Sequence, residues 1–504
     1  MKLSKLTLAV VAALGASVSS AAFAIDFYVD TKTKQIFAEP GKNRVKMGSF
    51  EQVTNSATQK ELAEEKKAIE EVKEELELKD NAIKALEEKV VSVKEDKAKN
   101  DEKWFNKIAV RGYTQMRYNL GLSGRISSGQ QPALASTGDG SIGNNTGFFL
   151  RRTRLVFSGD MNDYLSLYIQ SDLASSTGVA GGALHFAQLR DAYADIHFDK
   201  AHEYRVRAGI SKTPFGWENL QSSQNRLTLD RADALNSATP DERDLGLIAY
   251  WTPTHVQKLW KDLSKKGLKT SGDYGILGAG IYNGQGLNRA EQNDDLYVVA
   301  HSTYPLELGF MGDFFNGQVL EVGADAISGR FTPVTAAYTP FGTKAIAPAT
   351  TSKGIPAVKG DGLGRISEDR VAVHAVLFPQ PFGLQAEWNW GKSGGLNKDL
   401  GANGTIERRA LHGGYVQAMY KFDKVFGTEG TMIPYVKWQT YKGSWKKDTN
   451  MPYISTSELE AGVEYQIMKA LEFTVAYSDM SRTNDSAYAQ ADGRLLRMQL
   501  QFNY

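Results

Sequence analysis

The chain has 504 residues with 59 basic and 58 acidic side chains, a balance that points to no nucleic-acid partner. It contains no cysteine, which excludes a small disulfide-stapled extracellular domain. Its 48 Gly, 22 Tyr, 22 Phe and 8 Trp accompany a negative mean hydropathy, which is unusual for a soluble enzyme and expected of a transmembrane β-barrel.

Residues 1–24 have the pattern of a secretory signal peptide. Lys2 and Lys5 precede a short apolar run, and residues 22–24 fit an A-x-A cleavage site, so we predict that the mature chain begins at Ile25. The run is too short to span a bilayer, and no later stretch of about 18 apolar residues predicts a transmembrane helix. A retained membrane anchor is the alternative interpretation.

Residues 51–103 carry a seven-residue repeat, after a short segment at residues 25–50 in which a small hairpin is expected. Five heptads with no Gly or Pro predict an α-helical coiled coil, and therefore self-association as a dimer or a trimer. A single solvated helix is the alternative. The a positions hold Leu62, Ile69, Leu76, Ile83 and Val90, and the d positions hold Glu65, Val72, Lys79, Leu86 and Val93.

Residues 104–504 divide into segments of about ten residues in which apolar and polar side chains alternate, as in strands that cross an outer membrane. The last segment ends on Tyr504, so it can pair with the first and close a barrel. The sequence therefore predicts an all-β transmembrane barrel of sixteen antiparallel strands, which leaves room for an aqueous channel. The predicted strands lie near residues 107–120, 148–160, 163–173, 185–198, 203–212, 243–252, 273–283, 294–304, 318–329, 366–378, 383–393, 406–422, 431–445, 457–467, 470–481 and 493–504.

Residues 214–242 form a long connection that differs from the Gly- and Ser-rich loops expected on the outside. It carries Phe215, Trp217, Leu227 and Leu235, which need a surface to pack against. We therefore expect this connection to fold into the barrel and narrow it. An ordinary outer loop is the alternative.

Three short motifs resemble the phosphate-selective porin O and P family: FFLRRTRL at residues 148–155, LRDAYADI at residues 189–196 and RAGISKTPFG at residues 207–216. The resemblance is sharpest between residues 108 and 251. It implies a trimeric, sixteen-stranded barrel in the outer membrane of a Gram-negative bacterium, with an arginine-lined lumen that passes anions. The coiled coil and a large loop at residues 331–364 depart from the family pattern.

Basic side chains gather on the polar face of the first five strands and around the 214–242 connection. Guanidinium groups stay charged and bind oxyanions through a planar fork, so a row of them lets an anion move from one to the next. We therefore expect passive diffusion of phosphate or another small anion. The candidate residues are Arg111, Arg117, Arg152, Arg154, Arg205, Arg207, Lys212, Arg226, Arg231 and Arg243.

Acidic residues share this face and leave an alternative open. If Asp172, Asp191 and Asp195 neutralise the arginines, the barrel would be a general pore. A barrel that tethers the outer membrane to the cell wall through the coiled coil, or that encloses a haem protein, is a further possibility. The expected partners are membrane lipid, small anionic solutes and other copies of the chain.

An enzyme, a metal site and a cofactor are not expected. The seven histidines show no pair with metal-ligand spacing. Residues 391–395 match G-x-S-x-G, but this motif needs a following helix, and a Gly- and Asn-rich stretch follows here.

Overall fold

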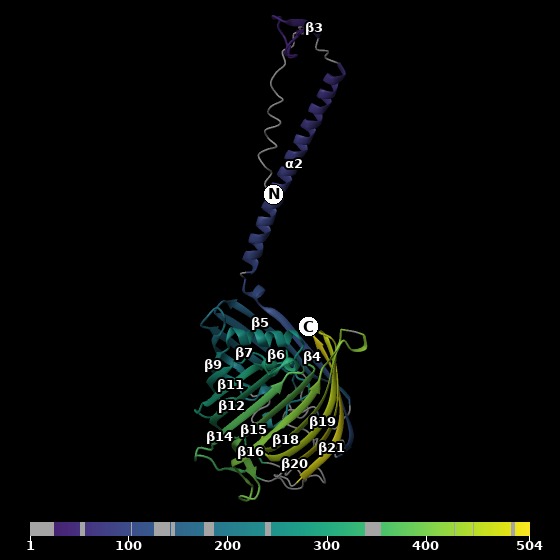
Figure 1. Ribbon diagram of the computed structural model, residues 1–504. Helices are drawn as coiled ribbons and strands as arrows, with labels where there is room; N and C mark the ends of the chain where they lie inside the picture. Colours follow the sequence, from purple (N-terminus) through teal and green to yellow (C-terminus); the bar gives the residue numbers. More distant parts are fainter. Residues whose placement is uncertain are drawn as a thin grey trace. The chain divides into compact units, whose positions relative to one another are not determined.

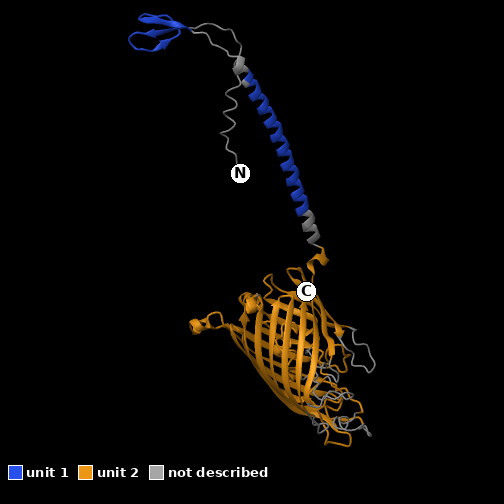
Figure 2. Cartoon of the chain, turned by 90° about the vertical axis from the view of Figure 1, so that its right-hand side faces the viewer, with its two compact units in different colours: residues 1–100 blue, residues 101–504 orange. Residues whose placement is uncertain are grey.

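The computed structural model describes residues 25–50, 56–101, 103–124, 142, 147–175, 186–236, 243–337, 354–427, 429–446, 448–484 and 489–504. The signal peptide predicted at residues 1–24 lies outside the described residues. The chain divides into two compact units, Met1–Asn100 and Asp101–Tyr504, drawn in blue and orange in Figure 2.

The first unit contains a small antiparallel sheet and one long helix. The sheet has the order β2-β1-β3 and is formed by β1 (Ile25–Asp30), β2 (Ile36–Phe37) and β3 (Arg44–Phe50). Helix α2 (Ser56–Asp101) follows and covers most of the predicted heptads. The apolar a and d side chains from Leu62 to Val93 are 50 to 67% exposed in the described part of this unit. The predicted helix is thus confirmed, with its apolar seam exposed.

The second unit is a closed antiparallel barrel (Figure 1). Within the described residues, sixteen long strands follow one another around the ring, and β21 pairs with β4 to close it. The predicted sixteen-stranded barrel is confirmed. The strands are β4 (Ala109–Gly124), β5 (Gly147–Asn162), β6 (Leu165–Ser175), β7 (Phe186–His197), β8 (Tyr204–Lys212), β9 (Arg243–Trp251), β10 (Leu277–Tyr282), β11 (Tyr297–Glu307), β12 (Val319–Phe331), β14 (Ile366–Leu377), β15 (Phe382–Asn397), β16 (Thr405–Tyr420), β18 (Thr431–Ser444), β19 (Tyr453–Met468), β20 (Leu471–Asn484) and β21 (Ala489–Asn503).

Short elements complete the barrel unit. Two-residue strands β13 (Ala357–Val358) and β17 (Phe422–Asp423) pair with β16 and β18, respectively. One helix of twelve residues, α4, spans Thr254–Lys265. The shorter helical turns are η1 (Trp104–Lys107), α3 (Trp217–Leu220), η2 (Asp233–Asn236), η3 (Leu308–Met311), η4 (Asp313–Phe315) and η5 (Val425–Gly427). No helix in the described part of the chain is long and apolar enough to cross a bilayer.

Side chains alternate between the two surfaces of the barrel wall. In β11, Tyr297, Val299 and His301 are buried inside, whereas Val298 and Tyr304 are exposed outside. Across the strands the outer surface is apolar and the inner surface is largely polar, as expected for a barrel that contacts hydrocarbon on its outside.

Two connections fold across the interior of the barrel. The first, residues 213–242 between β8 and β9, contains α3 and η2, and most of its described side chains are buried; we call it the inner loop. The second, residues 252–276 between β9 and β10, begins with α4, and we call it the strap. We call the end of the barrel where β4 begins and β21 ends the terminal mouth.

The seam between β4 and β21 has no room for a side chain at Gly112. Its N–H donates to the carbonyl of Tyr504 at 2.6 Å, and a Cβ atom there would lie 2.3 Å from the carbonyl oxygen of Arg154 and 2.5 Å from the Tyr504 ring. Gly147 in β5 has no atom within 4 Å of the same position.

We therefore predict that Gly112→Val destabilises the closed barrel by about 1–3 kcal/mol, because the added methyl groups overpack the seam. Gly147→Val, the matched control, should leave the barrel unchanged. The measurement is the fraction of chain that runs as the compact, unheated form in detergent electrophoresis. Equal fractions for the two variants would contradict this view of the seam.

Candidate functional site

The inner loop spans the interior from one wall to the opposite one. At its start, the N–H of Gly216 donates to Asp325 of β12 at 2.8 Å. Further along, the amide of Gln115 in β4 donates to the carbonyl of Ser223 at 3.0 Å. Strands β4 and β12 lie eight long strands apart in either direction around the ring, so the loop crosses a full diameter.

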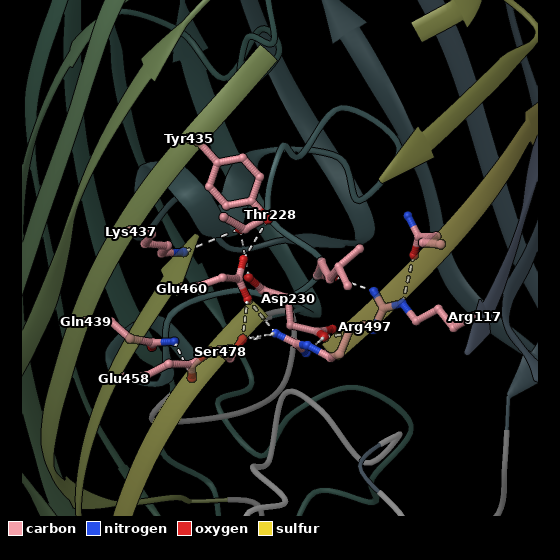
Figure 3. A network of polar contacts seen from close by, with 12 residues as sticks. Arg117, Thr228, Asp230, Tyr435, Lys437, Gln439, Glu458, Glu460, Ser478 and Arg497 are labelled. Carbon is pink, nitrogen blue, oxygen red and sulfur yellow. Dashed lines mark hydrogen bonds and ion pairs between the residues drawn. The ribbon is translucent and has the colours of Figure 1, made fainter. Parts of the chain in front are cut away.

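Asp230 of the inner loop lies among several guanidinium groups. Among the described residues, Arg117 lies 2.7 Å and Arg497 3.0 Å from its carboxylate, and Arg151 and Arg152 approach to 3.5 and 3.9 Å (Figure 3 shows Arg117 and Arg497). Burial alone would raise the pKa of Asp230, but these guanidinium groups hold it well below its usual range. One carboxylate therefore offsets only part of the positive charge around it.

Arg226 of the same loop is buried, with only 6% of its surface exposed. None of its three guanidinium nitrogens has a hydrogen-bond partner in the described residues. Burying a charged group is costly unless a partner satisfies it, so Arg226 is the strongest candidate in this interior for binding an incoming anion.

Three of the candidate arginines have carboxylate partners on the same wall. Because each of these carboxylates offsets the arginine it contacts, these three contribute less to the net charge of the interior than the cluster at Asp230. The pairs are Arg154–Asp172 at 2.9 Å, Arg207–Asp195 at 2.8 Å and Arg243–Asp191 at 3.0 Å.

Other candidate residues hold the connections in place. Lys212 donates to two backbone carbonyls at the end of α3, both at 2.8 Å, and Arg231 donates to carbonyls of the same turn. Arg205 binds Asp273 of the strap at 2.7 Å. Arg111 lies at the start of β4, where it is exposed, with its guanidinium 5.8 Å from the ring of Tyr168.

Two β-bulges change the faces that strand alternation predicts. Gln115 pairs with Arg152 and Met116 with Leu150, which leaves Arg151 as an extra residue that reaches Asp230. Strict alternation would place Phe149 on the same face as Leu155, but the one extra residue reverses the alternation between them. A second bulge similarly leaves Arg190 as the extra residue of β7, where it is buried.

The far side of the interior, from β12 to β19, is rich in carboxylates, none of which is among the predicted site residues. Arg497 of β21 joins the two sides, because it contacts Asp230 and lies 2.6 Å from Glu460 (Figure 3). Its position on the polar face of the last predicted strand was a signal that could have identified it. The buried carboxylates are Glu321, Asp325, Glu368, Glu387, Glu458, Glu460 and Glu464.

Comparison with known proteins gives a family match. The sequence model of the family described as phosphate-selective porin O and P matches residues 122–504. No curated protein matches the chain. Similar solved structures include the outer membrane channel DcaP of Acinetobacter baumannii (TM-score 0.44, 11% identity, 79% of this chain and 97% of that chain). Others are the trimer form of OmpT of Vibrio cholerae (0.43, 10%, 79% and 99%) and an anion-selective porin from Comamonas acidovorans (0.42, 10%, 79% and 99%).

We predict that Asp230→Asn destabilises the folded barrel by about 3–5 kcal/mol, because the surrounding guanidinium groups lose their shared buried carboxylate. The variant should convert to the unfolded form at a lower temperature in detergent electrophoresis. Asp163→Asn, which removes an exposed ion pair with Lys200, is the matched control and should convert at the wild-type temperature. Equal conversion temperatures for both variants would contradict a structural role for Asp230.

Proposed function

The chain belongs to the phosphate-selective porin O and P family and is an outer-membrane porin of a Gram-negative bacterium. We propose that it passes small anions, phosphate or another oxyanion, by passive diffusion along the arginine-rich side of its barrel. The predicted site residues Arg117, Arg152 and Arg226 are proposed to contact the solute, together with Arg151 and Arg497.

The observation that carries this proposal is the surplus of positive charge at the inner loop. Five arginines (Arg117, Arg151, Arg152, Arg226 and Arg497) gather around Asp230, and Glu458 and Glu460 approach Arg497. Glu218 also acts on Arg226, but it is paired with Lys437, so that pair adds no net charge. Counting Asp230, Glu458 and Glu460 against the five arginines then leaves a surplus of two positive charges. An anion entering this region meets a favourable potential.

The same cluster favours rapid exchange. A guanidinium that already contacts Asp230 binds a solute anion less tightly than a free one, so the anion can leave as well as enter. Arg226 has no internal hydrogen bond to release, but its guanidinium nitrogens are buried, so a solute reaches this planar fork when neighbouring side chains move aside. Arg154, Arg207 and Arg243, each with an aspartate partner, are proposed to line the path with weaker attraction.

A general pore is the second candidate function. The carboxylates from β12 to β19 face the arginine-rich side, and such an arrangement gives a field across the interior that both cations and anions can use. The sign of the selectivity distinguishes the two functions.

We also propose that α2 joins copies of the chain into a homotrimer through a periplasmic coiled coil. Support comes from the heptad repeat and from the exposed apolar seam of the helix, which includes Leu76 and Ile83. A helix this polar gains stability mainly by covering such a seam. Contact between the coiled coil and the cell wall stays a prediction.

We predict that Arg226→Gln makes the pore less anion-selective. Because a unit charge about 4 Å from a solute contributes about 1 kcal/mol in water, the anion-to-cation permeability ratio should fall about fivefold. The measurement is the reversal potential of single channels in a planar bilayer under a salt gradient.

Arg494→Gln is the control for this prediction, since Arg494 is exposed beside Asp479 and lies away from the cluster. Its reversal potential should equal that of the wild type. A wild-type pore that prefers cations would contradict the proposed function, and an unchanged ratio in Arg226→Gln would remove Arg226 from the path.

For the coiled coil, we predict that Leu76→Cys forms disulfide-linked chains under mild oxidation, because a positions face one another across the seam. The chain has no native cysteine, so each introduced thiol reports alone. Glu74→Cys, on the opposite face of the helix, should remain monomeric in reducing-agent-free electrophoresis. Equal crosslinking at both positions would contradict the proposed seam.

A further inference from the structure

We propose that the strap, residues 252–276, closes one half of the terminal mouth and confines solutes to the arginine-rich side of the barrel, with Lys269 holding its far end in place. The inference rests on the proposed pore function and adds a second element that determines which part of the interior conducts.

The strap spans the terminal mouth from one wall to the opposite wall. It leaves the wall between β9 and β10, and its Lys269 ammonium lies 2.6 Å from Glu464 of β19 and 3.4 Å from Glu472 of β20. Eight long strands separate the β9–β10 junction from the β19–β20 junction in either direction around the ring. The ion pair is therefore made across a full diameter, near the ends of β19 and β20.

Helix α4 seals the space on one side of this diameter. Its apolar residues Val256, Trp260 and Leu263 recur at helical spacing and are buried. They form one cluster with side chains at the terminal ends of β12 and β14, among them Val319 and Val376. An apolar cluster of this kind excludes water and ions, so among the described residues it closes the terminal mouth beneath β12 and β14.

The opposite half of the mouth is open by comparison. At the terminal ends of β4 and β5, Arg111 and Asp160 lie on the inner face and are exposed. At the corresponding ends of β12 and β14, Val319 and Phe378 are almost fully buried. The exposed half is the half beneath the arginine-rich wall.

The strap also supports the inner loop from below. Glu321 of β12 accepts one hydrogen bond from the indole of Trp217 in the inner loop at 2.7 Å and another from the indole of Trp260 in the strap at 2.8 Å. The amide of Gln221 donates to the carbonyl of Lys269 at 3.0 Å. Release of the strap would therefore loosen the constriction as well as open the mouth.

The experiment compares Lys269→Met with Lys266→Met in single-channel recordings of the full chain in symmetric salt. Lys269→Met leaves two carboxylates without their ammonium partner and should release the strap, so conductance should rise about twofold as the second half opens. Lys266 is exposed and its amine is 3.4 Å from the amide oxygen of Gln380, so its variant should conduct like the wild type.

A second variant keeps the inference testable if Lys269→Met folds poorly. Replacing residues 254–272 with an Asn-Gly turn removes most of the strap, including α4 and Lys269. Conductance should rise, and the anion-to-cation permeability ratio should fall, because the carboxylate-rich side then joins the path.

Wild-type conductance in a folded barrel that lacks the strap would overturn the inference. The reversal potential tests the anion function, and the conductance tests the strap. A cation-selective wild type whose conductance rises on strap removal would contradict the anion function and support the strap as a partial closure.

Discussion

Charge pairing inside the barrel holds both inward connections in position. The inner loop is fixed because Asp325 and Glu387 accept backbone N–H groups at its start, and because Asp230 lies among arginines of β4, β5 and β21. The strap is fixed at its far end by Lys269 between two glutamates. A buried charge without a partner is costly, so each connection is most stable where these charges meet.

This constraint divides the interior into two unlike sides. Arginines dominate from β4 to β8 and at β21, whereas glutamates are numerous from β12 to β19. The inner loop lies between them and presents Arg226 and Asp230, so its own charges complete the arginine-rich side. Selectivity in such a barrel depends on which side the solute passes, since the total charge of the chain is nearly zero.

Much of the barrel could be predicted from the sequence, because alternation is a local signal that each strand carries by itself. The strand count and the helical segment at the heptads followed from periodicity alone. The face of Phe149 could not be predicted, since a single extra residue at Arg151 reverses the alternation and leaves no mark in the sequence.

The pairing of the candidate arginines depends on contacts between residues far apart in the chain. Arg117 and Asp230, or Lys269 and Glu464, are more than one hundred residues apart, and no local pattern joins them. Helix α4 has only twelve residues, and nothing in its composition indicates that its apolar face enters the barrel mouth.

Glu321 has a consequence for how the interior can be observed. Its two carboxylate oxygens bind two indole rings that belong to connections entering from opposite ends of the barrel. Indole fluorescence is sensitive to the polarity and charge around the ring, so Trp217 and Trp260 are two intrinsic fluorescent probes of the same carboxylate. Any event that shifts this one carboxylate would alter the light emitted by both, without an added dye.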